Sequence, residues 1–177
     1  MLLNTKIQVS PKMVTVAVEN KHLFFEMPAL VLTCKADGKI LALGEEATEL
    51  VQRPTNLPKN LEAEYSYPLV SSQFDPPLAI AVISFSIYAI RSKLHQNLWR
   101  RILNLDHMNL NLNIWEYEKV ESKKRRHFEL LLGRQIPELR KISLNGRQIN
   151  RPWLERRSVQ LLIMCGLCIL VTLILTR

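Results

Sequence analysis

The stretch that decides the fold is residues 28–44, PALVLTCKADGKILALG. Two apolar runs flank the dipeptide Asp37-Gly38, and such a dipeptide between apolar runs is a strong signal for a β-hairpin. The next residues, 45–52 (EEATELVQ), predict a short helix that stops before Pro54, because proline interrupts a helix. The stretch therefore predicts strand, turn, strand and helix in direct succession.

The residues on both sides of this stretch extend the pattern. Residues 12–19 (KMVTVAVE) alternate in polarity and predict a strand, which residues 21–27 can pair with as a hairpin. Asp75 resembles a helix N-cap, with two prolines in the first turn. The thirteen residues 78–90 carry no charge, which is short for a membrane span and predicts a buried core helix.

The second half of the chain repeats the alternation of strand and helix. Residues 109–117 (NLNLNIWEY) alternate asparagine with apolar side chains and predict a strand with one polar face. That face can be a solvated position near the edge of a sheet, or it can meet a ligand or a polar partner. Residues 118–133 predict a helix that ends at a glycine, and residues 137–144 predict the last strand. This order is typical of an α/β domain with a mixed sheet.

The C-terminal segment has the composition of a membrane anchor. Residues 158–176 carry no formal charge, and as a helix they would extend about 28 Å, close to the thickness of a hydrocarbon core. The alternative is a buried C-terminal core helix. We predict a cytosolic domain over residues 1–150, a basic juxtamembrane linker over 151–157 and a transmembrane helix over 158–176 that holds the protein in the lipid bilayer.

The flanks of this segment predict its orientation. The N-terminal flank carries the basic and aromatic residues Arg151, Trp153, Arg156 and Arg157, and only Arg177 follows the segment. The positive-inside rule then keeps the large N-terminal part in the cytoplasm, as a single-pass protein. The first ten residues lack the apolar core of a secretory signal.

Charge is unevenly distributed along the chain. Residues 1–90 carry a net charge of −2 and residues 91–177 a net charge of +10. Four consecutive basic residues, KKRR at 123–126, lie in the predicted helix 118–133. Val120 and Phe128 define its buried side, so Lys124 is expected on that stripe and Lys123, Arg125 and Arg126 in solvent. These three form a candidate binding surface for anionic lipid or an acidic protein surface. The alternative is a solvated helix face.

Catalytic and metal-binding patterns are not visible in the sequence. The four histidines share no metal-ligand spacing, and Cys165 and Cys168 lie inside the predicted membrane segment. No phosphate-binding loop of the Walker type is present. There is no aromatic-rich β platform of the RNA-binding kind. We expect no catalytic residue, no cofactor, no metal and no nucleic-acid partner.

Residues 28–57, PALVLTCKADGKILALGEEATELVQRPTNL, resemble the bacterial actin homologue MreB. The family pattern has a proline, a strand, a hairpin, a GxxA motif and an RTP-like turn. These features correspond to Pro28, to Gly44 through Ala47 and to Arg53 through Thr55. Residues 67–77 (YPLVSSQFDPP) fit the family segment that leads into a long helix.

The resemblance implies one truncated actin-like (RNase-H-like) subdomain with a mixed sheet over residues 12–145. In the family, the first hairpin carries an Asp-x-Gly-Thr phosphate loop. The matching position is expected at Ala17-Val18-Glu19-Asn20, which has neither glycine nor threonine, although Glu19 can replace the acid. The second half of the family fold is not found in the sequence. The resemblance therefore implies a degenerate module without nucleotide and without enzymatic activity.

The same resemblance implies a location and a partner. MreB-like filaments run along the inner membrane and organise cell-wall synthesis. We therefore expect an interaction module at the cytoplasmic membrane face that binds or tethers an MreB-type filament or a cell-shape complex. One alternative is a tail-anchored effector-like protein that acts on another membrane. The other is a diverged nucleotide-binding actin-like ATPase.

Overall fold

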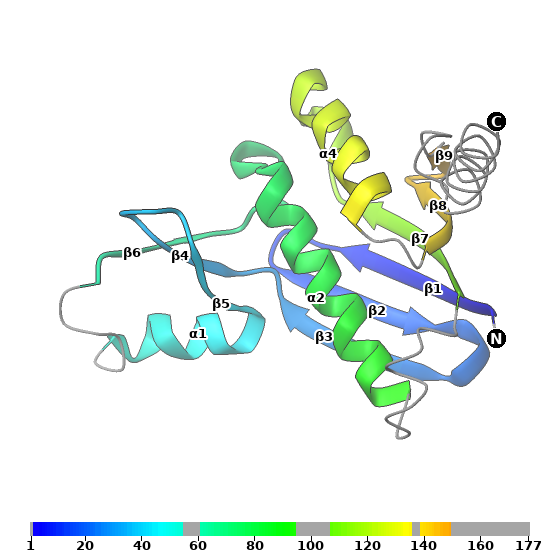
Figure 1. Cartoon of the computed structure of the whole chain (residues 1–177), viewed down its shortest axis with the longest axis horizontal. Coiled ribbons are helices and arrows are strands. Elements are labelled where there is room, and N and C mark those ends of the chain that lie inside the picture. Colours follow the sequence, from blue (N-terminus) through cyan, green and yellow to red (C-terminus); the bar gives the residue numbers. More distant parts are fainter. Residues whose placement is uncertain (1, 55–60, 95–106, 136–138, 150–177) are drawn as a thin grey trace, which may run out of the picture.

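The main body of the protein is a six-stranded mixed sheet with two helices on one face (Figure 1). The computed structural model describes residues 2–54, 61–94, 107–135 and 139–149. The strand order of the large sheet is β3-β2-β1-β7-β8-β9. Its strands are β1 (Leu2–Val9), β2 (Met13–Val18), β3 (Leu23–Pro28), β7 (His107–Ile114), β8 (Leu139–Leu144) and β9 (Arg147–Ile149).

A second, smaller sheet projects from this body, on the left of Figure 1. It contains β4 (Val31–Cys34), β5 (Ile40–Leu43) and β6 (Ala63–Ser66) in the order β5-β4-β6, and helix α1 (Gly44–Gln52) follows β5. Leu30, Leu32, Ala42 and Ala47 form a hydrophobic cluster of its own. The single mixed sheet expected from the sequence is thus wrong in one respect, because the strands divide between two sheets with separate clusters.

Helices α2 (Pro76–Leu94) and α4 (Ser122–Gln135) cover the same face of the large sheet. Their buried residues join one cluster with those of the strands, among them Ile7, Val16 and Leu112. Phe74, Tyr117 and Phe128 pack ring against ring at centroid distances of 5.3–5.9 Å. Short 3₁₀ turns complete the described elements, namely η1 (Glu19–Lys21), η3 (Ser71–Gln73) and η4 (Tyr117–Lys119).

The local signals in the sequence are confirmed. β4 and β5 pair as an antiparallel hairpin around Asp37-Gly38, and α1 follows as predicted. Asp75 caps α2, since the Leu78 N–H donates a hydrogen bond to Asp75 Oδ1 at 3.0 Å. Residues 78–90 lie inside α2, and their apolar side chains form much of the core.

Strand β1 was not predicted, and its presence moves the first hairpin. Its buried side chains Thr5, Ile7 and Val9 alternate with more exposed ones, and it pairs antiparallel with β2. The first hairpin turn is therefore at residues 10–12. The expected phosphate-loop position at Ala17-Val18-Glu19-Asn20 is wrong, because these residues end β2 and lead into β3 at the other end of the sheet.

The asparagine-bearing strand β7 lies in the interior of the sheet. It pairs in parallel with β1 on one side and with β8 on the other. The interpretation of its polar face as a position near a sheet edge is therefore wrong. Leu110, Leu112 and Ile114 of β7 are buried beneath the helices, so the asparagines point to the opposite face of the sheet.

The predicted linker and membrane segment, residues 151–157 and 158–176, lie outside the described residues. The same holds for the flanking residues Arg151, Trp153, Arg156 and Arg157. Within the described ranges, no helix combines the length and the apolarity that a membrane crossing requires.

Candidate functional site

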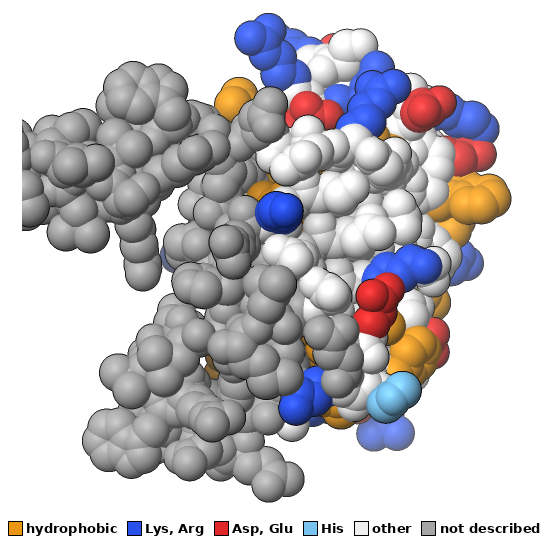
Figure 2. All heavy atoms as spheres, turned by 90° about the vertical axis from the view of Figure 1, so that its right-hand side faces the viewer, with side chains coloured by type: hydrophobic (Ala, Val, Ile, Leu, Met, Phe, Trp, Pro, Cys, Tyr) orange, Lys and Arg blue, Asp and Glu red, His pale blue; other side chains and the backbone are white. Residues whose placement is uncertain are grey.

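A groove of about 560 Å³ lies between α4 and the β8–β9 hairpin. Its lining includes three arginines, Arg125 and Arg126 from α4 and Arg147 from β9. Figure 2 shows lysine and arginine side chains, interspersed with acidic ones, on the upper part of this side of the molecule. Two of the three predicted surface residues thus line the groove, and the third, Lys123, is exposed on the same helix.

The order of burial along α4 differs from the prediction. Lys124 is exposed, whereas Arg125 is half-buried. The reason is that α4 begins at Ser122, so Val120 precedes the helix and does not set its buried stripe. That stripe runs through Phe128 and Leu132, and Arg125 lies one turn before Phe128.

Tyr117 lines the groove and bonds to α4. Its hydroxyl donates a hydrogen bond to the Arg125 carbonyl oxygen at 3.2 Å and also lies 3.5 Å from Glu129 Oε1. Burial raises the pKa of Tyr117 well above its ordinary range, and the charge of Glu129 adds to this shift. Tyr117 therefore stays protonated at neutral pH and remains a hydrogen-bond donor to the start of α4.

The Arg125 side chain is fixed by a hydrogen bond within α4. One terminal nitrogen, Nη2, donates to Ser122 Oγ at 3.2 Å, while its Nε is buried without an acceptor among the described residues. Arg126 and Arg147 are exposed. A planar guanidinium offers paired donors that match carboxylate or phosphate oxygens. The three arginines outnumber Glu118 and Glu129 in the lining, so this groove favours an anionic group.

Arg147 was not predicted as a site residue, although the sequence contains a turn signal just before it. Asn145 and Gly146 form the two-residue turn between β8 and β9, both with positive φ (45° and 79°). An Asn-Gly pair is the preferred sequence for such a turn. The Asn145 side chain accepts a hydrogen bond from the Ile114 N–H at 2.8 Å and donates one to the Ile114 carbonyl oxygen at 3.0 Å. These bonds fix the hairpin to β7 and place Arg147 beside α4.

The first hairpin turn lies at the carboxyl ends of β1 and β7, where open α/β sheets usually bind ligands. The Ser10 N–H donates to the Met13 carbonyl oxygen at 2.9 Å, and the Met13 N–H donates to Ser10 Oγ at 3.2 Å. Pro11 has no N–H. At most the Lys12 N–H is left for a ligand, whereas a phosphate-binding loop needs several free amides.

The cavity next to this turn has a volume of about 530 Å³ and a lining without charged side chains. Its side chains are Gln8, Val9, Ser10, Thr15, Asn113, Ile114, Trp115 and Asn145. None of them carries a carboxylate, and Glu19 lies at the other end of β2. A magnesium-bound nucleotide phosphate usually relies on a carboxylate ligand to the metal, which this cavity does not offer.

No protein-family model matches the sequence, and no curated protein matches it significantly. Solved structures match in fold. MreB5 of Spiroplasma citri bound to ADP superposes with a TM-score of 0.53 at 12% identity, over 81% of this chain and 38% of that chain. The AMPPNP-bound form of MreB5 gives the same TM-score at 14% identity. MamK in a double helical filament gives 0.51 at 12% identity, over 81% of this chain and 40% of that one.

This chain has an actin-like fold. The actin-like fold implied by the resemblance of residues 28–57 is thereby confirmed. At this level of identity the similarity concerns the fold alone. The chain spans about two fifths of the length of the MreB5 and MamK chains that it matches.

Proposed function

We propose that this protein is an actin-like interaction module that works without nucleotide and is held at the cytoplasmic face of a membrane by residues 158–176. Its partner in this proposal is an MreB-type filament or a cell-shape complex. The observation that carries the proposal is the closed first hairpin turn, Ser10-Pro11-Lys12, within an actin-like fold.

The closed turn supports the nucleotide-free part of the proposal. MreB5 has been solved with ADP and with AMPPNP, so that protein binds nucleotide. In this chain the turn has no glycine. The Ser10 N–H donates to the Met13 carbonyl oxygen, and the Met13 N–H donates to Ser10 Oγ. Opening the turn for a phosphate would break these hydrogen bonds. The opened turn would still lack a backbone N–H at Pro11.

The arginine-lined groove supports the interaction part. It combines a half-buried, fixed Arg125 with the exposed Arg126 and Arg147 on two different elements. Such an arrangement suits an acidic segment of a protein partner, because carboxylates can pair with several guanidinium groups at once. MamK has been solved as a filament, so an actin-like fold of this kind is compatible with assembly on a polymer.

Two experiments test the proposal. Calorimetry of the full chain in neutral detergent with magnesium and ATP should show no binding in the micromolar range. Such binding would refute the nucleotide-free function if it were lost in a Gln8→Ala, Asn113→Ala variant of the cavity next to the first hairpin turn.

Cross-linking of the membrane-inserted protein in cells should recover filament or cell-shape proteins. An Arg126→Gln, Arg147→Gln variant should recover fewer of them.

A further inference from the structure

The face of the large sheet opposite α2 and α4 carries a polar pocket that the proposed function does not use. A cavity of about 450 Å³ lies over the central residues of β1, β7 and β8. We call its strand side chains the amide face. They are Asn4, Lys6, Asn109, Asn111, Lys141 and Ser143.

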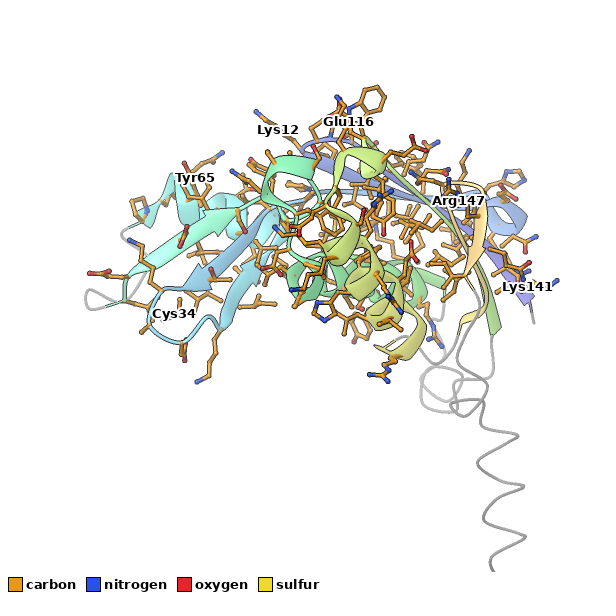
Figure 3. All side chains as sticks on the ribbon, turned by 90° about the horizontal axis from the view of Figure 1, so that it is seen from above. Lys12, Cys34, Tyr65, Glu116, Lys141 and Arg147 are labelled. Atoms are coloured by element: carbon orange, nitrogen blue, oxygen red, sulfur yellow. The ribbon has the colours of Figure 1, made fainter. Side chains whose placement is uncertain are left out.

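Strand register brings these side chains together. Asn4, Asn109 and Lys141 are neighbours across β1, β7 and β8, and Lys6, Asn111 and Ser143 form the next row on the same face. Adjacent strands are about 4.8 Å apart, so the two lysines straddle the pair of asparagines on β7. Figure 3 shows Lys141 at the end of the molecule far from Cys34 and Tyr65 of the small sheet.

The composition of the amide face is unusual for its position. A strand with parallel neighbours on both sides is normally apolar on both faces, because helices cover both. Here β7 is apolar only toward α2 and α4. Neither Lys6 nor Lys141 has an ion-pair partner among the described residues, so two positive charges face the pocket against the single carboxylate of Glu19.

One polar atom of the face is left without a hydrogen bond. Asn109 Nδ2 donates to Asn4 Oδ1 at 3.0 Å, while Asn109 Oδ1 is buried and has no donor within the described part of the chain. A buried acceptor without a partner is costly, and a ligand hydroxyl that reaches it would remove this cost.

We propose that the amide face binds a phosphate ester of a polyol, independently of the function proposed above. The phosphate would lie between the ammonium groups of Lys6 and Lys141. The hydroxyls would meet the amides of Asn109 and Asn111 and the hydroxyl of Ser143, which can both donate and accept. Such a group occurs in free sugar phosphates and in phospholipid headgroups.

Two other ligand classes fit the pocket less well. A metal ion is disfavoured, because the described residues contain no group of three acidic, histidine or cysteine side chains placed to hold one. A single-stranded nucleic acid requires aromatic side chains for base stacking, and the lining contains none. Amides and lysines instead match a small anionic ligand with many hydroxyls.

The test uses the full chain in neutral detergent, with glycerol 3-phosphate as the probe. The side-chain amide signals of Asn109 and Asn111 should shift in nitrogen-15 NMR spectra, and calorimetry should give the affinity. A Lys6→Gln, Lys141→Gln variant should bind at least about tenfold more weakly, because charge-assisted hydrogen bonds are the strong ones. The matched control, Lys35→Gln with Lys39→Gln, removes two exposed charges from the β4–β5 hairpin and should bind as the original does.

Two further comparisons are needed. One distinguishes recognition of the polyol from recognition of the phosphate, and the other distinguishes a free ligand from a lipid headgroup. Asn111 is exposed, so Asn111→Leu should spare the fold and weaken glycerol 3-phosphate binding more than that of inorganic phosphate. Nanodiscs with and without phosphatidylglycerol test the lipid source, and a response to either source supports the site. The proposal is overturned if neither source shifts the Asn109 and Asn111 signals, or if the Lys6/Lys141 variant and its control lose affinity equally.

Discussion

Removing the exposed charges around the arginine-lined groove should weaken binding to an acidic partner without unfolding the protein. The variant that tests this carries Lys123→Gln, Arg126→Gln and Arg147→Gln, which are all exposed positions. Arg125 is left intact, because its half-buried side chain bonds Ser122 and its loss would disturb the start of α4. Surface substitutions of this kind usually change the free energy of unfolding by only about 0.5 kcal/mol.

The expected loss of affinity follows from the exposure of the three charges. An exposed ion pair contributes about 0.2–1 kcal/mol, so three pairs contribute about 0.6–3 kcal/mol. Since about 1.4 kcal/mol corresponds to a factor of ten, binding should weaken by about 3-fold to 150-fold. The loss should shrink as salt is added, because added ions screen exposed charges.

Fluorescence anisotropy with a labelled polyglutamate peptide measures this effect on residues 1–150. All buried core residues of the described part lie between Thr5 and Leu144, so this fragment retains them. The control carries Lys35→Gln, Lys39→Gln and Arg53→Gln, which removes the same charge from the region of the small sheet and α1. Equal affinity losses in both variants would show a general charge effect and refute a role for the groove.

Three other outcomes follow from the structure and a fourth from the sequence. Phe128→Ala should lower the free energy of unfolding by about 3–5 kcal/mol in urea titrations, whereas Leu130→Ala, at a side chain that is 46% exposed, should lower it far less. Tyr117→Phe should cost about 1 kcal/mol at neutral pH. Because burial raises the pKa of Tyr117, the original protein should also lose stability above about pH 10, and Tyr117→Phe should lessen that loss in urea titrations at alkaline pH. Asn145→Ala should cost about 1–3 kcal/mol by thermal unfolding, since it removes both bonds to Ile114. Deleting residues 158–177 should move the protein from the membrane fraction to the supernatant in carbonate-washed fractions, and continued sedimentation would contradict the predicted anchor.

The parts of the fold that the sequence predicts well are those with local causes. The β4–β5 hairpin depends on a local turn of five residues, 35–39, in which Gly38 has a positive φ. The start of α2 depends on Asp75 and the residue three positions later. Strand β6 was not predicted, for the opposite reason. β6 is short and carries charged side chains, and its pairing with β4 joins residues about 30 positions apart. Its strand conformation comes from that partner and not from its own composition.

The candidate site could be predicted only in part. The basic residues of α4 are visible as a charge run, but their order of burial depends on where the helix begins. That start is set by the loop around Tyr117, whose ring packs against Phe74 and Phe128. Arg147 reaches the groove only because the β8–β9 turn is bonded to the end of β7. Neither contact is encoded in the spacing of residues along the chain.

The parallel pairing of β1 with β7 also sets the order in which this chain can fold during synthesis. Leu2 pairs with His107 and Val9 with Ile114, so β1 waits for a partner that emerges about 100 residues later. At typical elongation rates this interval lasts about 5–20 s. During that time β1 presents one unpaired edge while β2 already occupies the other. Nascent chains on neighbouring ribosomes can pair through such an edge, so this interval is an aggregation hazard that ends when β7 has left the ribosome.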